Sequence, residues 1–438
     1  MSHALLSLVL LSLFASAAPA ATDSESEQAW VDFELENGIQ VSMLYAPLAP
    51  QQALFTLLPL GLLDDAAERT QYAHLIEHLM IRTTDPVELQ VGDLLLNGET
   101  TALALRLETF SNPEPWLEAL ERHAKWLQAD HVEAEVLARE QLVIEQEEQQ
   151  TAETGYTHKW AMAAWNQVVR HGATHVALHG DVAQATTERS LEYLRDRLRV
   201  GPGVRFVSVG PVTLDEVRPA IEAALSGIEG ESWAVSVPSV SPEVVRGVKD
   251  HQATWDLPRR HYIEWFPVPD RSALDRVSAD ALALLLNIKM QQRGGLRASG
   301  VLATAAADLV SPEGRWIAIS ASLPLGVDPS LVQKEMATVK ATLGDGGEAG
   351  SVVMQLTMQL TEMPDFAQVR DQMVGAPGLK WIEAQQALFM LYAQLNMGLA
   401  LDELREAYAE LTAADLVTFG EAVLRDGQRS TLMLEPAD

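Results

Sequence analysis

The stretch His74-Leu75-Ile76-Glu77-His78 carries the clearest chemical signal in the sequence, and it lies within residues 69–82, whose spacing of apolar residues predicts a helix. His74 and His78 are four residues apart, so both imidazoles leave one face of that helix, one turn from each other. This geometry suits two nitrogen ligands on one Zn²⁺ ion. Glu77 lies beside the same face but offset from it, where a carboxylate can reach a metal-bound water without being a ligand.

A catalytic zinc usually has three protein ligands and an open fourth position. The chain has no cysteine, so the third ligand would be a His, Asp or Glu side chain. Residues 131–151 form a second predicted helix, which is strongly acidic and offers Glu140, Glu145, Glu147 and Glu148. Glu140 and Glu147 are seven residues apart, about 20° short of two helical turns, and therefore share a face. One of the two can bind the metal while the other orients the site.

Length and composition limit the classes of protein. The chain has 438 residues, which corresponds to about three domains, or to two larger ones, at about 150 residues per domain. With 31 Lys and Arg against 61 Asp and Glu, the formal net charge is −30. We expect no nucleic-acid partner, because neutralising phosphates requires basic residues. The acidic field would instead attract cationic peptides or metal ions. The lack of cysteine excludes disulfides and thiolate ligands.

The N-terminal residues 1–20 have the pattern of a secretory signal peptide. Their apolar stretch from Ala4 to Ala15 is too short to span a bilayer, and Ala18-Pro19-Ala20 supplies small residues for cleavage. The alternative is an uncleaved apolar anchor, because no Lys or Arg precedes the apolar stretch. No later segment reaches 18 uninterrupted apolar residues, so we expect no stable membrane insertion after cleavage.

Strand and helix patterns alternate irregularly along the first half. Residues 30–45 alternate apolar and polar side chains around Asn37-Gly38, a strong hairpin signal, and residues 53–63 form the continuous apolar run of a doubly buried strand. Residues 94–110 have the pattern of two strands with a turn at Asn97-Gly98, and residues 115–128 that of an amphipathic helix. This hairpin-then-helix order favours an α+β fold with mixed, mostly antiparallel sheets packed with helices.

The second half repeats the order strand, helix, strand, helices, although no direct sequence repeat is visible. We therefore predict two similar domains. The first covers residues 28–228 and contains the histidine motif. Residues 229–257, rich in Gly, Ser, Pro and Val, are the predicted linker, and residues 258–438 form the second domain.

Several segments resemble the pitrilysin/insulinase family of metallopeptidases, for which H-x-x-E-H is the inverzincin signature. The matching segments are NGIQV at residues 37–41, QYAHLIEHLM at 71–80 and NGET at 97–100. REQLVIEQE at 139–147 fits the family's downstream helix with two glutamates seven residues apart, and the segment 207–217 is similar to a strand and helix late in the family's first domain.

The resemblance implies a zinc site whose residues are the ligands His74, His78 and Glu147, the supporting carboxylate Glu140 and the general base Glu77. It also implies that the second domain is a homologous but inactive copy of the first. A substrate peptide would add as a strand to the sheet edge near Asn97.

The sequence departs from the family at several positions. Ile81 replaces the usual phenylalanine, Thr83 replaces a common glycine, and the interval between the second histidine and the glutamate ligand, 147 − 78 = 69 residues, is shorter than usual. In the second half, Arg297 lies in a segment that resembles the family's substrate-binding Arg/Tyr stretch, but Ala303 stands where the tyrosine would fall. Family members of this length often pair with a related subunit, so we expect a homodimer or a heterodimer whose partner supplies that pair.

Three functional hypotheses follow. The first is a periplasmic zinc endopeptidase in which Glu77 activates a zinc-bound water. The second is a partner-dependent or non-catalytic peptidase-like subunit, which the missing tyrosine favours. The third is an acidic metal-binding or peptide-binding protein of unrelated fold. A second metal site formed by His171, His175 and His179 is disfavoured, because Gly172 and Gly180 interrupt any helix there.

Overall fold

The computed structural model describes residues 31–437 with gaps. The gaps are residues 48, 50, 67, 85–89, 92–93, 102–103, 129–130, 155–163, 178–179, 199, 230–248, 299, 312–313, 346, 362–398, 400 and 426–428. The predicted signal peptide, His179 and most of the predicted linker therefore lie outside the described residues.

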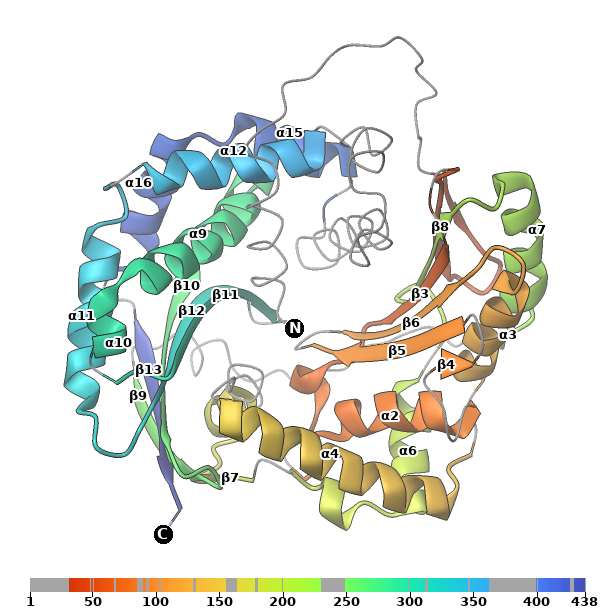
Figure 1. Cartoon of the computed structure of the whole chain (residues 1–438), viewed down its shortest axis with the longest axis horizontal. Coiled ribbons are helices and arrows are strands. Elements are labelled where there is room, and N and C mark those ends of the chain that lie inside the picture. The colour runs from red at the N-terminus through yellow and green to blue at the C-terminus, as the bar shows by residue number, and fades with distance from the viewer. Residues whose placement is uncertain are drawn as a thin grey trace.

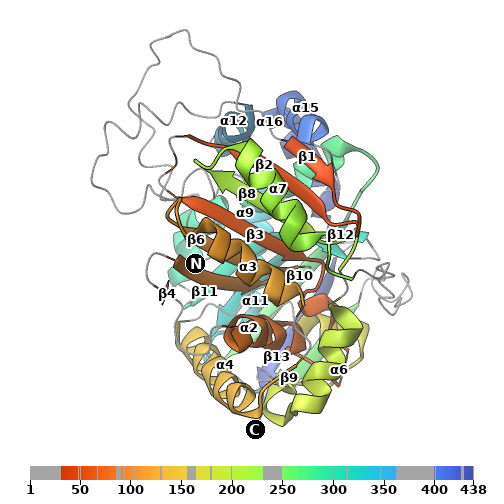
Figure 2. The ribbon, with the colours of Figure 1, turned by 90° about the vertical axis from the view of Figure 1, so that its right-hand side faces the viewer.

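The first half contains a seven-stranded mixed sheet in the order β1-β2-β8-β3-β6-β5-β4. Its strands are β1 (Val31–Glu34), β2 (Gln40–Tyr45), β3 (Gln52–Leu58), β4 (Gln90–Val91), β5 (Leu94–Thr100), β6 (Leu105–Ser111) and β8 (Arg205–Gly210). Its helices are α2 (Tyr72–Thr84), α3 (Trp116–Leu127), α4 (Ala134–Thr154), α6 (Thr187–Arg197) and α7 (Leu214–Leu225), with short turns η1 (Leu62–Asp64) and η3 (Val182–Gln184). Figure 2 shows α3 and α7 lying across the outer face of this sheet.

The second half contains a six-stranded sheet in the order β11-β12-β10-β13-β9-β7. Its strands are β7 (His175–Val176), β9 (Asp250–Trp255), β10 (Arg260–Val268), β11 (Ala303–Ser311), β12 (Gly314–Leu323) and β13 (Ser430–Pro436). Its helices are α9 (Ala273–Gln292), α10 (Gly294–Ala298), α11 (Pro329–Ala341), α12 (Glu348–Thr361), α15 (Leu401–Glu410) and α16 (Ala413–Val423). Figure 1 shows α3 and α7 on the side of the first sheet away from the second half, and α9 and α11 on the side of the second sheet away from the first half, whereas α2 and α4 lie below the first sheet.

The two sheets share one topology. In the first, β2 runs parallel to β8, which is followed by β3, β6 and β5 in antiparallel order. In the second, β9 runs parallel to β13, which is followed by β10, β12 and β11 in antiparallel order. The α+β class with two similar domains is thus confirmed. The domain boundaries stay predictions, although β9 occupies residues 250–255 inside the predicted linker.

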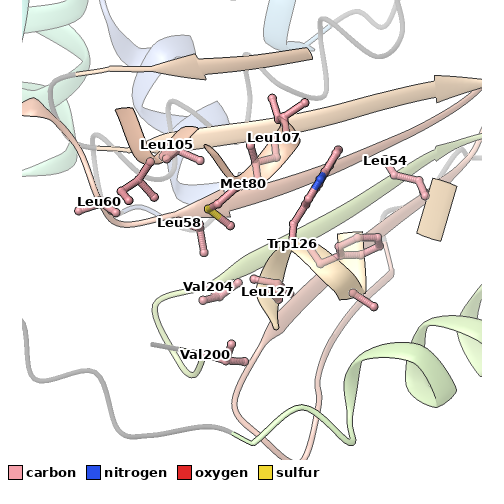
Figure 3. Packing of buried hydrophobic residues seen from close by; sticks show 14 of the residues in the cluster. Leu54, Leu58, Leu60, Met80, Leu105, Leu107, Trp126, Leu127, Val200 and Val204 are labelled. Atoms are coloured by element: carbon pink, nitrogen blue, oxygen red, sulfur yellow. The ribbon is translucent and has the colours of Figure 1, made fainter. Parts of the chain in front are cut away.

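Apolar side chains of the helices fill the space against the first sheet. Met80 of α2 and Trp126 of α3 lie over leucines of β3 and β6, including Leu58 and Leu107 (Figure 3). A fully buried Met or Leu side chain contributes about 1.5–3 kcal/mol relative to an exposed one, so this contact helps to hold α2 against the sheet. None of the described helices is long and apolar enough to cross a membrane.

Two local turn predictions had different outcomes. The hairpin at Asn37-Gly38 is confirmed, and Gly38 has a φ of +87°, a conformation that favours glycine. The turn predicted at Asn97-Gly98 is wrong. Both residues lie inside β5, and the turn to β6 is closed by a hydrogen bond from the Thr101 amide to the Ala104 carbonyl, 2.8 Å long. The reason that a glycine stands inside this strand lies in the contact with Glu77, described below.

Candidate metal centre

Helix α2 presents the histidine motif at the edge of the first core. Its apolar face packs into the core through Leu75, Ile76 and Leu79, which leaves His74 and His78 together on another face. The helix begins where the Ala73 amide donates to Asp65 Oδ1 over 3.0 Å. The Tyr193 hydroxyl donates to the same oxygen over 2.7 Å. A loop residue and a residue of α6 therefore hold the first turn of the helix in position.

Helix α4 brings the predicted third ligand to the two histidines. Glu147 Oε2 lies 3.6 Å from His74 Nε2 and 3.7 Å from His78 Nε2. The imidazole centroids are 4.9 Å apart with the rings nearly perpendicular. One ligand atom from each of His74, His78 and Glu147 lies within 4.8 Å of the others, a spacing that a single metal ion can bridge. Glu145 and Glu148, the other acidic candidates, do not belong to this group.

Glu140 lies behind the histidine pair. Its Oε2 is 3.1 Å from His78 Nδ1, and its Oε1 accepts from Arg139 Nε over 2.9 Å. A carboxylate only accepts, so His78 Nδ1 donates and the lone pair of neutral His78 is placed on Nε2, toward Glu147. Burial raises the pKa of Glu140, but the hydrogen bonds from His78 and Arg139 outweigh burial and hold that pKa below its usual value.

The electrostatics of the group favour positive charge. Burial lowers the pKa of His78, but the hydrogen bond with Glu140 and the closeness of Glu147 and Glu77 outweigh burial and raise it to about 9. Burial also raises the pKa of Glu147, yet the two imidazoles hold that pKa well below its usual range. The negative charge of these carboxylates can be balanced by a proton on His78 or by a divalent cation bound between the side chains.

These residues fit a zinc ion. Two imidazole nitrogens and one carboxylate form a donor set typical of catalytic zinc, with a position left for water or substrate. The Glu147 side chain is 48% exposed, so the group faces solvent on its carboxylate side. The buried, hydrogen-bonded Glu140 fixes His78 in the tautomer that binding a metal through Nε2 requires.

The Glu77 side chain, on the same helix, faces β5. The Thr100 hydroxyl donates to Glu77 Oε2 over 2.5 Å. A side chain at Gly98 would place its Cβ 2.6 Å from Glu77 Oε1, so glycine leaves room for the carboxylate above the strand. Sequence reasoning missed Thr100 and the role of Gly98. A glycine inside a strand indicates a close approach of another group, whereas the Asn-Gly pair by itself predicts a turn.

Among the described residues, β4 pairs with Leu94 and Leu95 of β5, and Asn97 lies farther along β5. Its side-chain amide donates to Glu108 Oε1 across to β6 over 2.5 Å. The predicted role of Asn97 in binding a peptide strand stays a prediction.

The second half has a helix in the place of α2. Helix α9 follows β10 and packs beside β11, as α2 follows β3 and packs beside β5. The Asn287 side chain of α9 exchanges two hydrogen bonds with the Ala306 backbone of β11, 2.7 and 2.8 Å long. If Asn287 is aligned with Glu77, Leu284 and Ile288 take the places of the two histidines. At these two positions the second half then has apolar side chains in place of imidazole nitrogens.

The remaining candidates lie apart from the group. Ala303 begins β11, and the side chain of Arg297 lies outside the described part of the chain. His175 is paired with Asp256, 3.1 Å away, and with the Thr254 hydroxyl, 2.9 Å away. Within the described residues, neither His171 nor His175 belongs to a group with metal-ligand spacing.

No known family model matches the sequence, and no curated protein matches it. Solved structures do match. A protease from Helicobacter pylori superimposes with a TM-score of 0.68 at 14% identity, over 93% of this chain and 100% of that one. A peptidase M16 inactive domain from Pseudomonas fluorescens gives a TM-score of 0.61 at 14% identity, over 94% and 98% of the two chains. The chain has the two-domain fold of M16-like peptidases.

A third match with this M16-like fold is the periplasmic protease PqqL from Escherichia coli, with a TM-score of 0.61 at 13% identity. The match covers 97% of this chain but 48% of PqqL, so the chain spans about half of that protein. The M16-like fold occurs in proteases and in an inactive domain alike. Which of the two this chain resembles in activity depends on its own side chains.

Proposed function

We propose that the protein is a zinc-dependent endopeptidase that hydrolyses extended peptides or unfolded protein segments. The observation that carries the proposal is the convergence of His74, His78 and Glu147 at metal-ligand spacing. Glu77 directly precedes His78 in the sequence. The Helicobacter pylori protease and PqqL share the fold and support the same reaction class. The periplasmic location proposed for this chain rests on its N-terminal pattern and on the description of PqqL as periplasmic.

Each residue has a distinct task in this proposal. His74, His78 and Glu147 would hold the zinc ion, which when bound lowers the pKa of a water and polarises the scissile carbonyl. Glu140 fixes the orientation of His78. Glu77 accepts the proton of the attacking water and passes it to the leaving amine. The edge of β5 beyond Leu95 would pair with the main chain of the substrate, so cleavage would depend more on extension than on side-chain identity.

A second candidate is a subunit that needs a partner. Ala303 stands in the stretch that resembles the Arg/Tyr pair, and one structural match is an inactive domain. In this case a related chain, in a homodimer or a heterodimer, would complete substrate binding while this chain holds the metal.

The test is zinc content and hydrolysis of an unstructured peptide library by wild type, Glu77→Gln and Glu145→Gln. We expect one zinc per chain in all three and a loss of turnover of at least about 100-fold in Glu77→Gln alone. Glu145 is the matched control, because it is an exposed glutamate of α4 outside the metal group. Zinc without cleavage, restored by a related subunit, would favour the second candidate, and absence of zinc would refute both.

A further inference from the structure

Glu77 is held by a hydrogen bond from the strand beside its helix. Its side chain is buried, and Oε2 accepts the 2.5 Å hydrogen bond from the Thr100 hydroxyl. Thr100 is itself 2% exposed, so solvent does not compete for its hydroxyl. A hydrogen bond from a buried hydroxyl to a carboxylate is stronger than one between neutral groups.

The alternation of β5 explains why Thr100 faces the helix. Leu94, Leu96 and Thr100 are buried and are separated by even numbers of positions, so they lie on one face of the strand. Both leucines belong to the core formed with the helices. Gly98 occupies the same face between them, where the Glu77 carboxylate passes over the backbone. The strand therefore leaves space for the Glu77 carboxylate at Gly98 and donates a hydrogen bond to it from Thr100.

We propose that Thr100 is a positioning residue for Glu77: its hydroxyl holds one carboxylate oxygen so that the side chain keeps the orientation a general base requires. The inference rests on the proposed peptidase function and deepens it. β5 is also the strand to whose edge the substrate would add, so the same element would align the peptide and the base. A carboxylate misplaced by about 1 Å can cost about 100-fold in rate.

The test compares Thr100→Val, which keeps the shape and removes the hydroxyl, with Thr100→Ser, which keeps the hydroxyl. We expect Thr100→Val to lower kcat about 10- to 100-fold with KM within about twofold and zinc content unchanged. Thr100→Ser should recover most of the lost kcat. Thr109→Val is the matched control, because Thr109 is a buried threonine on neighbouring β6 whose hydroxyl contacts His123 instead of Glu77.

Crystal structures of the Thr100 variants provide a readout that does not depend on activity. Glu77 Oε2 should stay bonded to the hydroxyl in Thr100→Ser and leave β5 in Thr100→Val. An unmoved carboxylate in Thr100→Val, or wild-type kcat in that variant, would overturn the inference. A wild type that binds zinc but cleaves nothing would instead count against the proposed function, and the position of Glu77 in the variants would still decide the role of Thr100.

Discussion

Two histidines on helices of the first half, His123 and His78, show how neighbouring groups decide the chemistry of an imidazole. His123 of α3 is fully buried, with the Thr56 hydroxyl 2.7 Å from Nδ1 and the Thr109 hydroxyl 3.1 Å from Nε2. No carboxylate contacts it in these bonds, and burial lowers its pKa to about 3. The carboxylates around His78 have the opposite effect and raise its pKa to about 9. A histidine on an apolar helix is therefore a structural core residue in one case and a candidate ligand in the other.

His123 makes the stability of the metal-free protein depend on pH. The folded state keeps His123 neutral down to about pH 3, whereas the unfolded chain protonates it below about 6.5. The unfolded state thus binds more protons in this window, so the free energy of unfolding falls as the pH falls from 6.5 toward 3. The contribution of His123 is up to about 1.4 kcal/mol per pH unit.

Urea unfolding of the chelator-treated protein between pH 4 and 7 measures this slope. His123→Gln should flatten it, and His131→Gln, at an exposed histidine, should leave it unchanged. Equal slopes in wild type and His123→Gln would show that His123 is protonated equally in both states.

At the scale of elements, tertiary contacts determine where α2 begins. Residues 69–82 are the predicted helix, but α2 covers Tyr72–Thr84. Gln71, immediately before it, has a φ of +67°, which a helix cannot continue. The first turn is held by Asp65, which accepts a hydrogen bond from the amide of Ala73, eight positions later in the chain. Burial raises the pKa of Asp65 to about 8, although its hydrogen bonds with Tyr193 and Ala73 lower it, so this carboxyl is mostly neutral at pH 7.

Asp65→Asn should therefore be tolerated, because an amide oxygen can accept from Ala73 and Tyr193 as the neutral carboxyl does. Asp65→Ala removes that acceptor and should lower the free energy of unfolding by about 2–3 kcal/mol, at about 1 kcal/mol for each lost hydrogen bond plus the cost of the buried gap. It should also weaken zinc binding, since His74 lies in the same turn as the amide of Ala73. Denaturant unfolding and zinc titration measure both effects. An equal loss in Asp65→Asn and Asp65→Ala would mean that the negative charge is required.

At the scale of the whole molecule, the chain of the first half crosses to the second sheet. The π-helical turn η2 (Asn166–Arg170) and β7 precede β8 in the chain, and β8 belongs to the first sheet. Nevertheless, β7 pairs with β9 of the second sheet. The ring centroid of Trp165 lies 6.2 Å from that of Trp265 and 5.9 Å from that of Trp316. The apolar cluster around them also includes Leu63, just ahead of the Asp65 loop. The two halves are thus joined by a shared core as well as by the covalent connection.

Trp165→Ala should loosen this junction at a cost of about 3–5 kcal/mol. We expect a larger radius of gyration by solution X-ray scattering and lower peptidase activity, with zinc content unchanged because the metal group lies wholly within the first half. Trp126→Ala is the control, since Trp126 is an equally large buried side chain inside the first core. It should destabilise that half without separating the two. An unchanged radius in Trp165→Ala would contradict a junction held by this cluster.

Patterns with short periods were enough to predict much of the molecule. The helical spacing of His74, Glu77 and His78 is local, because four residues complete about one turn wherever the helix lies. The α+β class with two similar domains followed from the order of strand and helix patterns. The seven-residue spacing together with the family resemblance predicts Glu147 as a ligand and Glu140 as a supporting carboxylate. In the structure Glu147 lies near both histidines and Glu140 near His78, and the roles stay predictions.

Only the tertiary structure decided which strand faces which helix. The Asn97-Gly98 pair has the sequence of a turn, but sheet register makes it strand and places Gly98 under Glu77. The hydrogen bond between Thr100 and Glu77 joins residues 23 positions apart. The hydrogen bonds between Asn287 and Ala306 join residues 19 positions apart. Such contacts depend on how a helix packs across a sheet edge. That packing is set by the whole core, so no local spacing encodes it.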